Sequence, residues 1–444
     1  MYLRRLRVQN VKLLRDVPIS FVGADGKPRM WTVFVGENRS CKTTLLQTIA
    51  AAASGRDQAI HLTTDVVSSW PDLRRPSSRL AIEAEFGFSA TRHAWRSYPN
   101  EGTENFQPLD SPLLKAELLL EPGHSVFDGN ATFLGQPGSS GDPLVAARRR
   151  NLADWFVAGY GVRRMLRSTG LFDKLRQYDP SLDRLKPLFG EDVVGTRFIE
   201  LLGGDLGRSF AKILQSIFVT GGLLPHITEL ELRGRGGIRS TKDFINSQRF
   251  EMDIVDDQGE PIRVPAAWLS QGYQSIIAWL ADVVGQILLE SGQSVEAAEM
   301  EGCVLVDEID MYLHPTWQLR LIPALKKVFP RLQFIATTHS PMVLTALEAE
   351  EVWLLSHDAE GSVIARPALR SPALLTGTEL FESFFEIEHL YPSELGEKAS
   401  EYGRLATDPT RTAEEDIHMI ELRGELAAAG VVFDWDPVLR EIAE

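Results

Sequence analysis

Cysteine is scarce in this chain: its 444 residues include only Cys41 and Cys303. So few thiols exclude the disulfide framework of small secreted proteins and favour a reducing compartment. Cys303 lies about 13 Å along an extended strand from the strand end at Asp307. Because bonded cysteines need Cα atoms within about 7 Å, we predict that the two thiols do not pair. The expected location is the cytoplasm.

Long apolar runs are also missing. No stretch approaches the about 20 apolar residues of a membrane span. Residues 1–5 lead directly into strand-like sequence, without the apolar core of a signal peptide. The sequence therefore predicts no membrane partner. Hydrophobic residues make up 44% of the chain, enough for a sizeable core and for two or three domains.

Positive charge is short at the C-terminal end. The net charge is −15, and residues 378–444 hold 17 acidic and 5 basic residues, which gives this segment −12. The rest of the chain is therefore nearly neutral. An acidic segment repels phosphate backbones, whereas a neutral remainder still allows a local basic face. The charge thus leaves nucleic acid open as a partner.

A strand, a glycine-containing loop and a helix follow one another near the start. Residues 31–35 read as an apolar strand, and an apolar helix pattern follows Thr44. This is the context of a phosphate-binding P-loop, whose backbone N–H groups and helix N-terminus bind phosphates. Lys42 would reach the β- and γ-phosphate oxygens, and Thr43 would offer a hydroxyl to Mg²⁺. The expected nucleotide-binding residues are Gly36, Glu37, Asn38, Arg39, Ser40, Cys41, Lys42, Thr43 and Thr44.

One position departs from the P-loop pattern. Cys41 stands where GxxxxGK[ST] has its second glycine. Glycine permits backbone conformations and close approaches that a Cβ atom hinders. A weak or slow nucleotide site is therefore one expectation from this sequence.

Two further apolar strands end in polar side chains. Residues 304–306 lead into Asp307 and Glu308, and residues 334–336 lead into a turn that contains His339. In an open α/β sheet, ligands bind at the edge formed by the carboxyl ends of the strands. An acid pair and a histidine near one nucleotide can hold Mg²⁺, activate water and contact a γ-phosphate. We expect these side chains to lie beside the P-loop.

A third segment, Ser270 to Gly272, opens an apolar helix over residues 276–289. The N-terminus of a helix presents free N–H groups and a positive dipole end to an anion. The alternative is an ordinary N-cap, in which Ser270 satisfies the first turn. Its position between the P-loop and the acidic strand favours the anion-binding interpretation.

These segments together resemble a known family. GENRSCKTT, LSQGYQS, CVLVDEID followed by LHP, and TTHSP, in that order, resemble the RecF/SMC/OLD-like branch of ABC-type ATPases. They are most similar to compact bacterial AAA-type members found in anti-phage systems such as Septu. The resemblance covers residues 1–60 and about 150–370. It implies an α/β fold: a P-loop NTPase of ABC/SMC-head type with an inserted α+β lid and a helical C-terminal region.

The resemblance also implies roles for the matched residues. Asp307 would hold Mg²⁺ together with Thr43, Glu308 would be the general base toward water, and His339 would contact the γ-phosphate. ATP and Mg²⁺ are therefore the expected cofactors.

In this family two heads close face to face around ATP. Ser270 and Gly272 would then reach the γ-phosphate of the nucleotide held by the other protomer. The implied assembly is a homodimer or higher oligomer formed through ATP.

Several assignments stay open at this stage, and no glutamine loop is recognisable. Residues 157–164 resemble a YGxxR segment of the same branch, in which Arg163 either meets nucleotide or a neighbouring subunit, or is a solvated turn residue. Asp310 and His314 have a functional and a turn-stabilising interpretation. Near the N-terminus, three arginines either approach the nucleotide or are solvated strand positions: Arg4, Arg5 and Arg7.

The long middle segment lacks the sustained heptads of a coiled coil. Recurrent glycine and proline predict short strands and helices instead, with a loop over residues 128–142. The predicted organisation has four parts. They are the N-terminal part of the ATPase core with the P-loop (1–60), inserted strands and a helical lid (61–255), the C-terminal part of the core (256–370) and an acidic helical tail (371–444).

The tail carries a capping-box pattern from Thr412 to Glu415, and a last short helix is expected to begin with residues 434–437, which include Trp435. No nuclease motif is recognisable in it. We therefore expect a separately encoded effector, such as a nuclease, as the partner.

Three functions are compatible with these features. The favoured one is an ATPase that dimerises around ATP and regulates or senses for an effector, in anti-phage defence. The second is a RecF-like DNA repair or recombination ATPase, which requires a continuous basic groove and salt-sensitive binding. The third is a nucleotide-gated scaffold with little turnover, suggested by Cys41.

Overall fold

The structure is a computed structural model of the full chain. It describes residues 1–88, 113–133, 155–164, 180–190, 204–224, 226–232, 248–291, 294–385, 387 and 393–431. The chain divides into two compact units, Met1–Leu374 and Leu375–Glu444.

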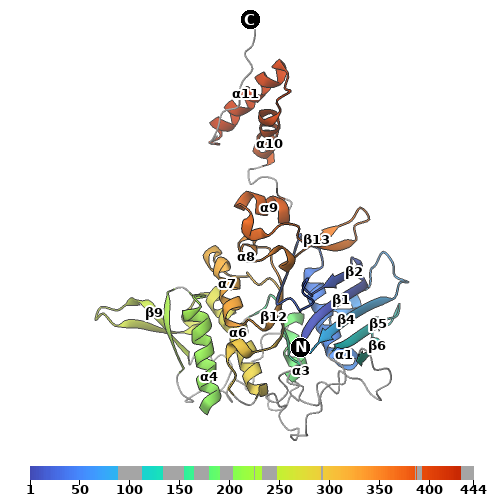
Figure 1. The fold of residues 1–444 in the computed structure, drawn as a ribbon, viewed down its shortest axis with the longest axis vertical. Coiled ribbons are helices and arrows are strands. Elements are labelled where there is room, and N and C mark those ends of the chain that lie inside the picture. Colours follow the sequence, from blue (N-terminus) through green and yellow to red (C-terminus); the bar gives the residue numbers. More distant parts are fainter. Residues whose placement is uncertain are drawn as a thin grey trace. The chain divides into compact units, whose positions relative to one another are not determined.

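An 11-stranded mixed sheet organises the larger unit, in the order β6-β5-β4-β1-β2-β14-β13-β3-β12-β11-β7 (Figure 1). Its parallel half consists of β3 (Trp31–Gly36), β7 (Val157–Tyr160), β11 (Gly302–Val306), β12 (Leu332–Thr337) and β13 (Val352–His357). β11 and β12 are buried along their whole length, as is typical of parallel strands covered on both faces. The three strands expected around residues 31–35, 304–306 and 334–336 are confirmed.

The other half of the sheet is antiparallel. It consists of β1 (Tyr2–Val11), β2 (Leu14–Ser20), β4 (Leu80–Gly87), β5 (Leu113–Leu120) and β6 (Asp128–Phe133). β14 (Val363–Pro367) joins the halves, because it pairs antiparallel with β13 and parallel with β2. The strands of residues 80–133 thus extend the sheet that begins with β1.

The prediction of a loop over residues 128–142 is wrong for its first six residues, which form β6. β6 is a sheet-end strand of mixed polarity, so it lacks the alternation by which a strand is recognised. Antiparallel pairing with β5 stabilises it instead. A Cβ atom at Gly129 would lie 2.0 Å from the Glu117 carbonyl oxygen, so the two backbones approach closely there. Residues 134–142 lie outside the described part of the chain.

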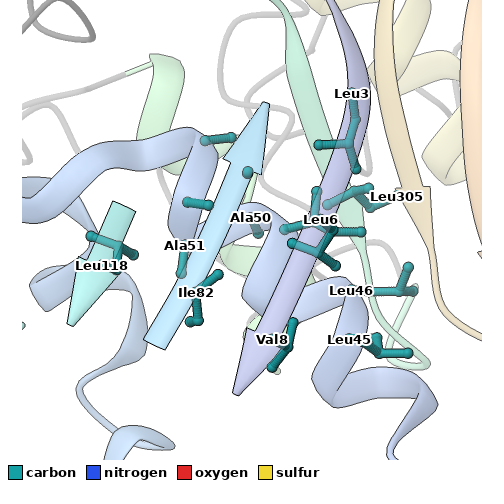
Figure 2. Close-up of a cluster of buried hydrophobic side chains, with 14 of the residues drawn as sticks. Leu3, Leu6, Val8, Leu45, Leu46, Ala50, Ala51, Ile82, Leu118 and Leu305 are labelled. Carbon is teal, nitrogen blue, oxygen red and sulfur yellow. The ribbon is translucent and has the colours of Figure 1, made fainter. Parts of the chain in front are cut away.

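Helix α1 (Lys42–Thr63) joins the two halves of the sheet through one hydrophobic core. Leu45, Leu46, Ala50 and Ala51 of α1 lie against side chains of β1, β4, β5 and β11 (Figure 2). The small alanines allow the helix to lie close to the strands. The first residue of this helix is Lys42, so the same packing fixes the P-loop.

Helix α6 (Gln271–Ser291) covers the other face of the sheet at β7, where the Tyr160 ring lies 5.8 Å from that of Trp279. It is the one helix among the described residues that is long and apolar enough to cross a membrane. Of that apolar window, 94% is buried inside the protein, as expected for a core helix.

The remaining elements of this unit are short. A three-stranded sheet contains β8 (Ile227–Leu232), β9 (Gln248–Val255) and β10 (Pro261–Pro265). The helices are α3 (Pro180–Asp183), α4 (Gly204–Gln215), α7 (Pro315–Val328) and α8 (Pro341–Leu344). No described helix between residues 64 and 255 exceeds the 12 residues of α4, in agreement with the short elements predicted for this segment.

The smaller unit is helical, as predicted. It contains α9 (Gly377–Phe385), α10 (Ser393–Thr407) and α11 (Ala413–Ala428). α10 and α11 share a small core, and the capping box of Thr412 and Glu415 is confirmed. The helix expected to begin with residues 434–437 lies outside the described residues. These elements confirm the predicted fold class, a P-loop-type α/β domain with inserted elements and a helical C-terminal region.

Candidate nucleotide-binding site

The carboxyl ends of four neighbouring parallel strands form the site. The strand order β3-β12-β11-β7 brings together the P-loop after β3, the turn with His339 after β12, the acid pair after β11 and the YGxxR-like turn after β7. Segments up to 264 residues apart in sequence therefore meet through hydrogen bonds. This is the edge at which open α/β sheets bind ligands.

Lys42 lies inside the P-loop. Its Nζ donates hydrogen bonds to the carbonyl oxygens of Gly36 (2.7 Å) and Glu37 (2.8 Å) and to Ser40 Oγ (3.3 Å). Burial lowers the pKa of Lys42, and the carboxylates of Asp307 and Glu308 oppose that shift. The ammonium is thus held where the loop and the acidic strand meet.

The first residue of the P-loop must be glycine. A Cβ atom at Gly36 would lie 2.3 Å from the Leu355 carbonyl oxygen and 2.9 Å from Ser40 Oγ. The loop therefore turns directly against β13. Glu37, Asn38 and Arg39, at the crest of the loop, are exposed.

Cys41 adopts a backbone conformation that glycine adopts more easily, which explains why the P-loop pattern has glycine at this position. It is the N-cap residue of α1 with φ 61° and ψ 25°, in the left-handed region that disfavours a Cβ atom. Its thiol donates a weak hydrogen bond to the Arg39 carbonyl oxygen at 3.7 Å, and burial raises its pKa. The substitution therefore retains the loop conformation and introduces backbone strain.

A chain of hydrogen bonds links the P-loop to two strands. Thr43 Oγ1 donates to Asp307 Oδ2 and Thr337 Oγ1 donates to Asp307 Oδ1, both at 2.7 Å. A hydroxyl and a carboxylate oxygen in contact fit Mg²⁺, which is commonly held by one or two carboxylates plus substrate phosphates. Within the described ranges there is no group of three or more His, Cys, Asp or Glu that could hold a metal by itself.

Glu308 follows in a turn with φ 45°, again in the left-handed region. Its N–H donates to Thr337 Oγ1 at 2.7 Å. Burial raises the pKa of the Glu308 carboxyl, and Asp307 and Asp310 add to the shift. A carboxylate with a raised pKa is a stronger proton acceptor when ionised.

His339 belongs to the same electrostatic environment. Burial and then the nearby Lys42 lower its pKa, while Asp310 and Asp307 act in the opposite direction. The lowered pKa favours the neutral imidazole at pH 7. The structure thus brings His339 into the neighbourhood of Lys42 and the acid pair.

The segment from Ser270 to Gly272, the signature turn, makes no hydrogen bond or ion pair with the P-loop of the same chain among the described residues. Ser270 is exposed directly before α6, and the neighbouring Trp268 is 78% exposed. Gly272 is buried, and a Cβ atom there would lie 2.4 Å from the Tyr312 carbonyl oxygen. Contact with a nucleotide of another protomer stays a prediction for both.

The open assignments divide as follows. His314 caps α7 through its side chain, and Thr338 Oγ1 donates to Asp310 Oδ1, so both make turn-stabilising contacts. Near the N-terminus, Arg4 and Arg5 lie near Glu85, and Arg7 pairs with Asp16. The basic residue that approaches the P-loop helix is instead Lys12, whose Nζ donates to Thr44 Oγ1 at 3.0 Å.

The two arginines after β7 lie in different environments, and the exposure of Arg163 fits its interpretation as a solvated turn residue. Arg163 is exposed, whereas Arg164 is buried and donates from Nη2 to the carbonyl oxygens of Asp307 (2.8 Å) and Glu308. The signal was present, because the last position of YGxxR is Arg164. Thr337 opens the TTHSP segment, but that pattern does not predict its hydrogen bonds with Asp307 and Glu308.

Known proteins are similar to this chain in the segments that form the site. Residues 232–345, which contain the signature turn, the acid pair and His339, match the family described as "AAA domain, putative AbiEii toxin, Type IV TA system". The chain is 40% identical over 110 residues to the Retron Ec83 probable ATPase of Escherichia coli, which is 25% of this chain and 20% of that protein. It is 25% identical over 431 residues to the Septu protein PtuA of Bacillus mycoides, 96% of this chain and 50% of that protein.

The resemblance to Septu-type proteins is confirmed. The chain spans half or less of the length of these relatives. The solved SMC head domain of Thermotoga maritima overlaps 83% of this chain and 99% of its own, with 15% identity and a TM-score of 0.43. The fold class rests here on the sheet order and the loop positions described above.

Proposed function

We propose that this chain binds ATP and hydrolyses it in a Mg²⁺-dependent reaction. The observation that carries the proposal is the hydrogen bond between Thr43 and Asp307. It joins a P-loop containing a buried lysine to an acid pair, and these are the parts that phosphoryl transfer to water requires. The resemblance to a retron probable ATPase supports the same activity.

Each residue has a role in this proposal. Lys42 and the N–H groups of the P-loop bind the β- and γ-phosphates, and Thr43 and Asp307 hold the metal ion. Mg²⁺, when bound, neutralises charge on the phosphate oxygens. Glu308 accepts the proton of the attacking water, and the neutral imidazole of His339 donates a hydrogen bond to the γ-phosphate.

We further propose that two copies close around ATP. Ser270 is exposed at the N-terminus of the 21-residue helix α6, which suits it to meet a γ-phosphate held by a second copy. Gly272 supports this turn by allowing α6 to lie against the Tyr312 backbone. The assembly would be a homodimer or a higher oligomer that depends on ATP.

The biological role that we propose is regulation of a separately encoded effector, such as a nuclease, in anti-phage defence in the cytoplasm. The names of the Septu and retron relatives support it. An effector gene beside the gene for this chain is the expected genomic arrangement. A neighbourhood of replication and repair genes would favour the RecF-like alternative.

Cys41 favours a second candidate function, a nucleotide-gated scaffold with little turnover. Its strained backbone conformation and its Cβ atom lie within the loop that would hold phosphates. In this case ATP would control assembly, and hydrolysis would be negligible.

Phosphate release from ATP by the native chain, Glu308→Gln and Cys41→Gly separates these candidates. The ATPase proposal expects turnover by the native chain and loss of turnover in Glu308→Gln, on the order of 10²- to 10⁴-fold for a missing general base. ATP binding should persist in Glu308→Gln and disappear in Lys42→Ala. If only Cys41→Gly hydrolyses ATP, the native chain is a scaffold and the ATPase proposal fails.

A further inference from the structure

The end of β7 reaches the acid pair directly. β7 and β11 are parallel neighbours with Tyr160 opposite Val306, and the Asp307 N–H donates to the Tyr160 carbonyl oxygen at 2.8 Å. The residues that follow Tyr160 must therefore pass beside Asp307 and Glu308. At Gly161 the chain passes close to another segment, since a Cβ atom at this position would lie 2.7 Å from the Pro187 carbonyl oxygen.

Arg164 then points back toward the acid pair. One nitrogen, Nη2, donates to two consecutive carbonyl oxygens, those of Asp307 and Glu308. The Arg164 side chain is only 1% exposed. A buried guanidinium that bridges main-chain oxygens restrains the backbone path more strongly than a solvated side chain could.

The backbone that Arg164 holds is strained. Glu308 has φ 45°, and a residue with a Cβ atom persists in the left-handed region when surrounding contacts over-determine it. Thr337 Oγ1 accepts the N–H of Glu308, while Arg164 donates to its carbonyl oxygen. The peptide groups on both sides of the Glu308 side chain are thus fixed by contacts from neighbouring strands.

The positive charge of Arg164 lies near the carboxylates of the acid pair. Among the described residues it makes no ion pair within 4 Å, and its Nε has no hydrogen-bond partner. Burial lowers the pKa of Arg164 to about 10, and Asp307, Asp310 and Glu308 oppose the shift. The cation therefore stays charged at pH 7 and offsets three nearby carboxylates.

We propose that Arg164 is the positioning residue of the hydrolytic site: it holds the strained turn that aims the Glu308 carboxylate at the attacking water. This inference rests on the proposed ATPase function. Arg164 acts through Glu308 and does not contact the nucleotide. Arg163, its exposed neighbour, makes neither of these contacts with the acid pair.

Steady-state hydrolysis by the full-length chain tests the role, with Arg163→Gln as the matched control. We expect Arg164→Gln to lower kcat on the order of 10²-fold, the effect of a catalytic group displaced by about 1 Å. KM for ATP should stay unchanged, and nucleotide binding measured by calorimetry should persist. Arg164→Lys, which keeps a buried cationic donor, should recover most of the lost kcat, and Arg163→Gln should match the native chain.

A double-variant cycle separates positioning from a direct role. If Arg164 acts through Glu308, the variant that combines Arg164→Gln with Glu308→Gln should be no slower than Glu308→Gln alone. A further fall in rate in the combined variant would mean that Arg164 acts independently, which would overturn the proposal.

Other results would also overturn it. These are a rise in KM with native kcat in Arg164→Gln, a loss of activity in Arg163→Gln equal to that in Arg164→Gln, or unfolded protein for both Arg164 variants. The last would show that Arg164 serves the fold alone. No hydrolysis by the native chain would refute the ATPase function itself, and with it this role. Active native enzyme with an equally active Arg164→Gln variant would refute only the role of Arg164.

Discussion

At the scale of single residues, the site contains non-glycine positions in the left-handed backbone region, among them Cys41 and Glu308. Cys41 caps the N-terminus of α1 and Glu308 follows β11, with φ 61° and 45°. Such residues cluster where surrounding structure stores strain for a function. In this chain both lie at the contact between the P-loop and the acidic strand.

The strain at Cys41 predicts the effect of restoring glycine. Cys41→Gly should raise the free energy of unfolding by up to about 1 kcal/mol, because the left-handed conformation costs about 1–2 kcal/mol with a Cβ atom and glycine loses more entropy on folding. It should also accelerate ATP turnover. Denaturant unfolding and phosphate release measure the two effects. A slower, less stable Cys41→Gly variant would contradict this view of the loop.

The raised pKa of Glu308 predicts that the stability of the fold depends on pH. Its pKa in the folded protein is raised above 4.5, mainly by burial. Its ionisation therefore weakens the fold as pH rises through the folded pKa. Glu308→Gln should have a higher Tm than the native chain at pH 7.5, and the difference should vanish below pH 4.5. Thermal denaturation at both values checks the sign, and equal Tm values at pH 7.5 would refute it.

At the scale of elements, α6 connects an exposed turn to the interior. It begins beside Ser270 and carries the buried Asp282, whose Oδ2 accepts a hydrogen bond from Tyr160 Oη at 2.6 Å. Tyr160 is the last residue of β7, four residues before Arg164. The signature turn and the acid pair are therefore attached to the same strand end.

Substitutions at Gly272 and Ser270 should have different effects, the first on stability and the second on ATP-dependent dimerisation. Gly272→Ala places a Cβ atom 2.4 Å from the Tyr312 carbonyl oxygen and should cost about 1–3 kcal/mol of stability, as overpacking does. Ser270→Ala changes an exposed residue and should leave Tm unchanged while weakening ATP-dependent dimerisation. Calorimetry and sedimentation distinguish the two. A normal ATP dimer in Ser270→Ala would argue against the composite site.

Asp282 predicts a second pH effect, in the interior of α6. Complete burial raises its pKa to about 6, against the hydrogen bond from Tyr160. Because the folded pKa exceeds the unfolded value of 3.8, its stabilising contribution is lost as pH rises from about 4 to above 6. Asp282→Asn should therefore gain stability over the native chain at pH 7.5 and not at pH 4. The free energy of unfolding of both proteins is measured across this pH range. A difference between them that does not change with pH would exclude the effect.

At the scale of the whole molecule, two units have separate cores. The C-terminal unit depends on a few buried residues of α10 and α11 and on the buried pair of Arg411 and Asp416 at 2.6 Å. Arg411 also donates to the carbonyl oxygens of Leu405 and Asp408. One side chain thus ties the end of α10 to the start of α11.

Arg411→Ala should therefore unfold this unit selectively. Removing one partner of a buried ion pair costs about 3–5 kcal/mol, because the other charge stays buried and unpaired. The calorimetric transition of this unit should shift to lower temperature or disappear, while the affinity for ATP should stay unchanged. Lys398→Ala, at a half-exposed pair with Glu425, is a control that should change little. Loss of ATP binding in Arg411→Ala would show that the units depend on each other.

Local sequence patterns predict several elements of this structure. The apolar runs of β3, β11 and β12, the P-loop between a strand and a helix, and the cap of α11 are each encoded within about ten residues. The weak edge strand β6 was mistaken for a loop because it lacks alternation and is stabilised by pairing with β5. The organisation into four parts and the roles of the site residues stay predictions.

The sequence by itself determined which segments carry phosphate chemistry, because glycine, lysine, threonine and acid pairs act through short-range geometry that their spacing reveals. Only the tertiary structure decided which side chains support them. Arg164, Thr337 and Lys12 contact residues 29 to 144 positions away, through strand order and register. The motifs YGxxR and TTHSP contain Arg164 and Thr337 but do not reveal which distant residues they contact, since the residues at both ends would be equally acceptable on a solvated turn.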